Sequence, residues 1–214
     1  MTEIIKILEI AGTIAFSVSG ALIACGAGLD IFGVVFVGCT TAIGGGIIRD
    51  VVLGIHPPTI FTNYLLFILA VFTSVITFII AYINKEKFHP LKSKIDTVNN
   101  YFDAVGLAVF SVIGAEAGFV NGHSHNVFII VLCGMITGVG GGIIRDIMIG
   151  TTPYVFKKHV YALASILGSL LYYLLRYYLE TVSLASGVTI FCVILIRILA
   201  TKYRWELPKM TWKK

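Results

Sequence analysis

The sequence predicts an all-α membrane protein with seven transmembrane helices, built as two inverted three-helix repeats and a seventh helix. Three observations predict this architecture. First, 57% of the 214 residues are hydrophobic and only 13% are charged, about half the charged fraction of a soluble domain. Second, several runs without charge approach the ~20 residues that cross a bilayer. Third, one glycine-rich motif occurs twice. Lipid is therefore the expected solvent for most of this surface.

The charge-free runs and one proline pair position the helices. Pro cannot continue a helix interior, so the pair Pro57-Pro58 moves the start of the third helix to about Ile60. The segment 84–100 is polar and is expected to be a loop. The seven spans are expected near 10–29, 31–48, 60–83, 101–119, 126–150, 157–178 and 182–200.

The distribution of Lys and Arg predicts the orientation. If the N-terminus is outside, eleven basic residues fall on the cytoplasmic side and only Lys6 and Arg176 fall outside. The positive-inside rule therefore selects an external N-terminus and a cytoplasmic C-terminus in a multi-pass plasma-membrane protein. The eleven are Lys85, Lys87, Lys92, Lys94, Lys157, Lys158, Lys202, Arg204, Lys209, Lys213 and Lys214. Because the net charge of +5 lies in loops and the tail, nucleic acid is not an expected partner.

An internal repeat divides the chain. The heptapeptide 44–50, GGGIIRD, recurs at 140–146, an offset of 96. Upstream, the residues at 12, 16, 17 and 20 recur at an offset of 94. The expected organisation is a first repeat at 1–83, a basic cytoplasmic loop at 84–100, a second repeat at 101–179, and a seventh helix with a basic cytoplasmic tail at 180–214. Three helices are an odd number, so the second repeat enters the membrane from the opposite face.

The glycine triplets are the first candidate functional feature. Three adjacent glycines weaken a helix and favour a kink or local break, and broken helices in inverted repeats point to a transport site near the midplane. The alternative is close helix packing, since Gly38, Ala42 and Gly46 form a ladder of small residues that the second repeat reproduces. The triplets are Gly44, Gly45 and Gly46, and Gly140, Gly141 and Gly142.

The Arg-Asp pair that ends each motif is the second candidate functional feature. A charge inside a span costs about 2.5–3.5 kcal/mol on insertion scales, so such residues face the protein interior or a watery path. Neighbours on a helix point about 100° apart. We therefore expect crossed pairs about the pseudo-axis: Arg49 with Asp146, and Arg145 with Asp50.

Other polar positions carry weaker expectations. Ser17 and Ser111 occupy equivalent places and either line a polar path or bond the carbonyl four residues back. Glu116 is expected at an aqueous mouth or at the interface, and Arg197 is expected to reach toward lipid headgroups. No ligand set for a metal, no cofactor motif and no nucleophile-base constellation is apparent, so an enzyme is not expected.

The duplicated GGGxxRD motif in two three-helix halves, with a seventh helix, resembles the prokaryotic trimeric intracellular cation (TRIC) channels. Bacterial relatives are also labelled as glycine transporter domain proteins. The resemblance covers about 4–200. It implies a homotrimer with one pore in each subunit, permeable to K⁺ and to some Na⁺, and shaped by glycine-kinked second and fifth helices. The resemblance assigns to this pore the matching residues of each half, which are Gly44, Gly45, Gly46, Arg49 and Asp50, and Gly140, Gly141, Gly142, Arg145 and Asp146.

Two functions follow from the sequence. A monovalent cation channel, chiefly for K⁺, would use backbone carbonyls and the two aspartates along its path. A secondary transporter of a small solute such as glycine fits inverted repeats equally well. K⁺, Na⁺ and membrane lipids are the expected partners, and unitary current steps would distinguish the channel from saturable uptake.

Overall fold

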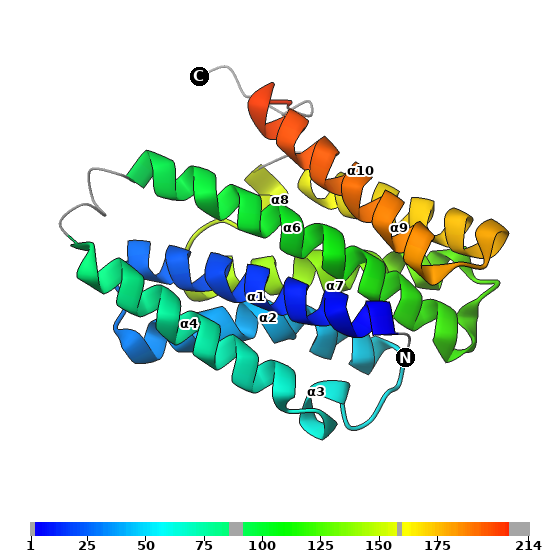
Figure 1. Cartoon of the computed structure of the whole chain (residues 1–214), viewed down its shortest axis with the longest axis horizontal. Helices are drawn as coiled ribbons and strands as arrows, with labels where there is room; N and C mark the ends of the chain where they lie inside the picture. Colours follow the sequence, from blue (N-terminus) through cyan, green and yellow to red (C-terminus); the bar gives the residue numbers. More distant parts are fainter. Residues whose placement is uncertain (1–2, 86–91, 158–159, 206–214) are drawn as a thin grey trace, which may run out of the picture.

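The computed structural model describes residues 3–85, 92–157 and 160–205. Seven long helices in this part of the chain are long and apolar enough to cross a membrane, as predicted. They lie side by side along the long axis of the molecule (Figure 1). They are α1 Glu3–Gly26, α2 Ile31–Val52, α4 Leu65–Ile83, α6 Lys92–Gly118, α7 Val127–Met148, α9 Tyr161–Leu179 and α10 Val182–Lys202. Three short elements join them: α3 Thr59–Thr62, the π-helical turn η1 Phe119–His123, and α8 Tyr154–Lys157.

Four helix starts differ from the predicted ones. The first long helix begins at Glu3, seven residues before the expected start, because it includes charged residues that the charge-free run left out, and the sixth begins at Tyr161, four residues after the expected start. The third long helix begins at Leu65, because the residues after the proline pair form the separate helix α3. The fourth begins at Lys92, within the segment expected to be a loop. Its early polar residues are used in packing: Asn99 is buried and accepts a 2.8 Å hydrogen bond from Ser19. The central part of the expected loop, 86–91, and the tail 206–214 lie outside the described residues.

The ends of α2 and α7 repeat the same local chemistry. Asp30 caps the start of α2 by accepting from the Gly33 amide at 2.8 Å. Asn126, 96 residues later, caps α7 by accepting from the Ile129 amide at 3.2 Å. After each helix comes a glycine with positive φ, Gly54 or Gly150, the conformation that ends helices and that glycine adopts without strain. The two repeats are therefore equivalent in structure as well as in sequence.

The glycine triplets lie where α2 and α7 cross. Both helices run through their triplets without interruption, so the predicted break is not present. A Cβ on Gly45 would lie closer than 3.0 Å to the carbonyl oxygen of Thr137, and one on Gly141 would meet that of Thr41 in the same way. These two contacts are related by the offset of 96. The close helix packing that the sequence also predicts for these glycines is therefore present: without side chains, the two helix backbones touch.

The first helices of the two repeats also meet through equivalent residues. Phe16 of α1 and Phe110 of α6 pack with ring centroids 5.2 Å apart, and these positions differ by 94. Together with the crossing of α2 and α7, this places a pseudo-two-fold axis through the centre of the bundle. The helix α10 packs against α6 and α9 and has no counterpart in the first repeat (Figure 1).

Candidate functional site: two Arg-Asp motifs at opposite ends of the bundle

The arginines pair with their own neighbours, so the expected crossed pairing is wrong. Arg49 donates from Nε and Nη2 to Oδ1 of Asp50 at 2.8 and 2.6 Å. Arg145 donates from Nε to Oδ1 of Asp146 at 2.8 Å. Both pairs are buried. An arginine side chain is long enough to turn back to the adjacent carboxylate, so the 100° between adjacent positions does not prevent pairing.

Distance is the second reason for this pairing. The second motif contacts Ser19, whereas the first shares a cavity with Glu9. These two residues of α1 are ten positions apart, about 15 Å along a helix. The motifs therefore lie toward opposite ends of the bundle, too far apart for the arginine of one motif to pair with the aspartate of the other.

Each aspartate also fastens the chain that follows its helix. Oδ2 of Asp50 accepts hydrogen bonds from the backbone amide of Thr59, at 2.8 Å, and from the Thr59 hydroxyl. Oδ2 of Asp146 accepts from the backbone amide of Tyr154 at 2.7 Å. The carboxylates thus hold α3 and α8 against the ends of α2 and α7. This double use explains why an acidic residue follows the arginine in both motifs.

The second motif belongs to a closed polar network. Arg145 is fully buried, and its Nη1 donates to Asp103 and to Ser19, both at 2.8 Å. The hydroxyl of Tyr161 also donates to Asp103, at 3.3 Å. Every one of these side chains is at most 1% exposed. Buried charge is tolerated when it is paired and hydrogen-bonded in this way, and the network around Arg145 is closed to solvent.

Arg197 of α10 joins the edge of this network, so the expectation that it extends to lipid headgroups is wrong. It is 2% exposed. Its guanidinium lies 4.6 Å from the Tyr161 ring centroid, and Nη2 is 3.7 Å from Oδ2 of Asp103. α10 turns this face toward α6 and α9, which buries the side chain.

The first motif borders a partly open cavity of about 100 Å³, in which charged and polar side chains lie among apolar ones such as Ile43 and Leu66. Arg49 and Asp50 line it with a second acid, Glu9 of α1. In the described part of the chain, Glu9 has no hydrogen-bond or ion-pair partner, whereas Arg49 is already bound to Asp50. Hydroxyl or amide groups at positions 13, 59, 63 and 137 also line the cavity. Two carboxylates and one guanidinium leave it with a formal charge of −1.

The two ends differ because a few repeat positions carry different residues. The offset of 94 relates Glu9 to Asp103, so each motif has an acid on the neighbouring first helix. The same offset also relates Ser19 to Ile113. Ser19 bonds to Arg145 in the closed network, whereas Ile113 lines the open cavity at the other end. The sequence carried the signal for both acids. The offset of 94 that relates Gly12 to Gly106 also relates these two acids.

The predicted serines do not line the open cavity. Ser111 donates to the carbonyl of Leu107 at 2.7 Å and lies 2.6 Å from the Ser165 hydroxyl. Ser17 is fully buried, and its hydroxyl has no partner in the described part of the structure. Glu116 is also buried, where it accepts from Tyr172 at 2.8 Å. For Ser111, the bond to the preceding turn is therefore the correct alternative.

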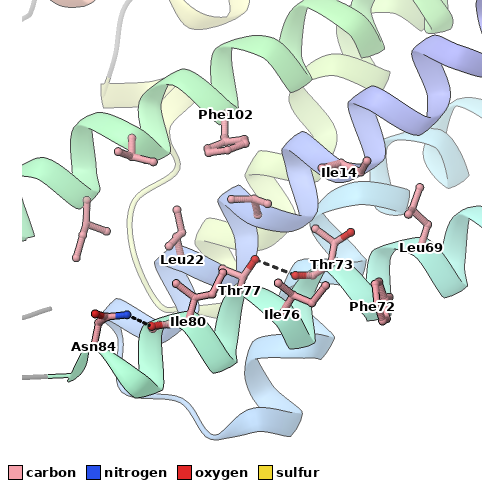
Figure 2. Close-up of a pocket in the computed structure, with 14 residues that line it drawn as sticks. Ile14, Leu22, Leu69, Phe72, Thr73, Ile76, Thr77, Ile80, Asn84 and Phe102 are labelled. Atoms are coloured by element: carbon pink, nitrogen blue, oxygen red, sulfur yellow. Dashed lines mark hydrogen bonds between the residues drawn. The ribbon is translucent and has the colours of Figure 1, made fainter.

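A larger cavity of about 700 Å³ is apolar. It lies between α1, α4 and α6, where Leu22, Ile76 and Phe102 point into it (Figure 2). Its few polar groups serve their own helix: Thr77 donates to the carbonyl of Thr73, and Asn84 to that of Ile80, both at 2.8 Å. It offers no polar surface that could replace an ion's hydration shell, so the candidate site for ions is the smaller, polar cavity.

The chain matches known membrane proteins over its whole length. A family profile described as "Glycine transporter" matches residues 6–82 and again 100–177, once for each three-helix repeat. The UPF0126 inner membrane protein YadS of Escherichia coli (strain K12) is 37% identical over 205 residues, which cover 94% of this chain and 93% of that protein. A UPF0126 membrane protein of Vibrio cholerae serotype O1 is 37% identical over 219 residues, covering 100% of this chain and 85% of that protein.

Solved structures agree with the sequence matches. A prokaryotic TRIC channel, crystallised in 0.5 M KCl, superimposes with a TM-score of 0.84 at 36% identity and covers 97% of this chain and 100% of its own. A structure described as a basis for conductance through TRIC cation channels gives a TM-score of 0.83 at 33% identity, covering 98% of both chains. This chain is a multi-pass membrane protein with the same fold, and it belongs to the trimeric intracellular cation (TRIC) channel family.

Proposed function

We propose that this protein is a channel for monovalent cations, chiefly K⁺ with some Na⁺. One observation supports it most: the open polar cavity carries a carboxylate, that of Glu9, without a cationic partner. A cavity of one charge sign with low-dielectric walls raises the local concentration of the opposite ion. The likeness to TRIC cation channels points to the same function.

The proposed pathway passes beside the crossing of α2 and α7. A cation enters the cavity next to Glu9 and Asp50, where threonine hydroxyls and the Asn63 amide can replace part of its water shell. The glycine triplets keep the two helices close, and the path narrows there. Because the network around Arg145 is fully buried, conduction requires this end to open.

The proposal extends to assembly and orientation. The TRIC channels that match this chain are trimeric by name, and we propose a homotrimer with a pore in each subunit. The excess of basic residues in the loops supports an external N-terminus and a cytoplasmic C-terminus in the plasma membrane. In this orientation the cavity beside Glu9 opens to the outside.

The test is a recording in planar bilayers under a KCl gradient, with wild type and Glu9→Gln. Wild type is expected to give unitary steps that reverse on the cation side. The variant is expected to conduct less at low salt and to recover in 1 M KCl, where the Debye length is only about 3 Å. Glu3→Gln is the matched control, because Glu3 is exposed on the same helix and bound to Lys6. Equal currents in all three would reject the cavity as the pathway.

A secondary transporter is the second candidate, favoured by the description of the matching family as "Glycine transporter". A cavity open at one end of the bundle and a sealed network at the other also suit alternating access. Well-folded protein that gives no current steps, but takes up glycine into liposomes with saturation, would move the assignment to this function.

A further inference from the structure

We propose that an anionic phospholipid occupies the apolar groove between α1, α4 and α6, with one acyl chain in the groove and its phosphate beside Lys85. This inference does not depend on the channel function. The groove has a volume of about 700 Å³, and Leu22, Ile76 and Phe102 point into it (Figure 2). At ~30 Å³ for a group the size of a water molecule, it has room for roughly twenty, which matches the methylene groups of one long acyl chain.

The helices α4 and α9 are equivalent, which gives the groove a counterpart in the second repeat. Ser74 of α4 approaches Gly38 of α2, and Ser169 of α9 approaches Gly134 of α7 in the same way. The offset is 96 for the glycines and 95 for the serines. The groove on α1 and α4 can therefore be compared with the face of α6 and α9 against which α10 packs.

Short side chains leave the groove open. In the second repeat, the long side chains of Tyr172 and Arg176 fill the equivalent place, where both contact Glu116. The offset of 95 puts Thr77 and Ala81 at these positions in α4, and both line the groove. Among the described residues, the first repeat also has no counterpart of α10 to cover this place.

The walls of the groove suit a flexible chain better than a second helix. α10 comes close to α9 at Gly168, where an added Cβ would lie closer than 3.0 Å to Val193. The equivalent residue of α4 is Thr73, whose branched side chain lines the groove. Because helices in membranes pack closely through small residues, a helix from a second copy cannot approach α4 here as α10 approaches α9. An acyl chain can follow the uneven surface.

The charge at one end of the groove indicates an anionic headgroup. The lining ends at Asn84 of α4 and Ile95 of α6, and the exposed Lys85 follows directly. The sequence at 85–96 contains four lysines and two acids, whereas 54–64, before the other end of α4, contains no Lys, Arg, Asp or Glu. Basic residues beside the end of a membrane span attract anionic lipid headgroups. The groove and the lysines therefore match the two parts of one lipid molecule.

Native mass spectrometry of the full-length protein tests the acyl-chain contact. The protein in a neutral detergent is mixed with equal amounts of phosphatidylglycerol and phosphatidylcholine, and the retained lipids are counted. Wild type is expected to retain phosphatidylglycerol in preference. Ala81→Phe fills the groove and is expected to lower this retention at least about tenfold. Ile79→Phe is the matched control on the same helix, because Ile79 is 46% exposed and lies outside the groove.

A second pair of variants tests the headgroup contact without touching the groove. Lys85→Gln with Lys94→Gln, which lies in the first turn of α6, removes two positive charges. The pair is expected to lower phosphatidylglycerol retention at least about tenfold, since charge-assisted contacts to the phosphate are lost, and to leave phosphatidylcholine retention unchanged. Lys202→Gln with Arg204→Gln removes two charges at the end of α10 and is expected to change neither.

Each result decides the proposal. Loss of phosphatidylglycerol in Ala81→Phe and in the lysine pair, with both controls like wild type, supports it. Equal retention of the two lipids by wild type, or unchanged retention in folded Ala81→Phe, overturns it. If Ala81→Phe does not fold, unchanged preference in the lysine pair overturns it. If Ala81→Phe separates the assembly into single subunits and leaves lipid retention unchanged, a second copy occupies the groove and the proposal is wrong.

Discussion

Gly45 and Gly46 are adjacent, yet the structure predicts opposite effects when each becomes alanine. A Cβ on Gly45 would lie closer than 3.0 Å to the backbone carbonyl of Thr137 on the facing helix. A backbone group cannot turn away as a flexible side chain can. A Cβ on Gly46 would meet only Nη2 of Arg49, at 3.9 Å, which is ordinary contact. If packing at the crossing explains the triplet, only the first substitution forces α2 and α7 apart.

The size of the destabilisation by Gly45→Ala follows from how far the new methyl group must push α2 and α7 apart. Contact between carbon and oxygen is comfortable near 3.5 Å, so the helices must separate by about 1 Å. Overpacking of this kind costs about 1–3 kcal/mol. Replacing glycine with alanine inside a helix also gains up to ~1 kcal/mol, but this gain is common to Gly45→Ala and Gly46→Ala. The two variants should therefore differ by about 1–3 kcal/mol.

Thermal unfolding of both variants in the same detergent measures this difference. For a chain of this size, 1 kcal/mol moves the melting temperature by about 2–4 °C, so Gly45→Ala should melt roughly 2–12 °C below Gly46→Ala. Gly141→Ala should behave like Gly45→Ala, because its Cβ meets the carbonyl of Thr41. Equal melting temperatures for all three would refute the packing explanation and return the triplets to the role of flexible hinges.

Three further predictions test other parts of the molecule. Arg145→Leu leaves buried Asp146 without its cation and leaves Asp103 with only Arg197, at 3.7 Å, so it should cost about 3–5 kcal/mol, measured as lost folded yield and a lower melting temperature. Tyr172→Phe removes the 2.8 Å hydrogen bond to buried Glu116 and should cost about 1–3 kcal/mol; an unchanged melting temperature would show that the bond does not stabilise the fold. In a cysteine-free background, an impermeant maleimide should label His125→Cys from outside and Lys85→Cys only after lysis; the reverse pattern would invert the proposed topology.

The asymmetry between the two ends has a structural cause. The repeats share the motif and an acid on the first helix, but only the second repeat is covered by α10 and its Arg197. Ser19 and Tyr161 complete the network there. At the other end an isoleucine, Ile113, replaces the serine and a cavity remains. A duplicated sequence therefore yields one open and one sealed site.

The sequence alone determined the helices, the repeat and the positions of the charges. Hydropathy is a local property, so the number of spans and their approximate positions can be read directly from the chain. The offset between the repeats even contained the relation of Glu9 to Asp103.

Only the tertiary structure decided which groups meet. Whether Arg49 reaches Asp50 or Asp146, and whether Arg197 faces lipid or a buried tyrosine, depends on how each helix is rotated and where it crosses its neighbours. Hydropathy does not encode rotation, since lipid accepts any apolar face equally. The same limit applies to the triplets, because sequence shows where a backbone can be approached and only packing shows that Thr137 and Thr41 approach it.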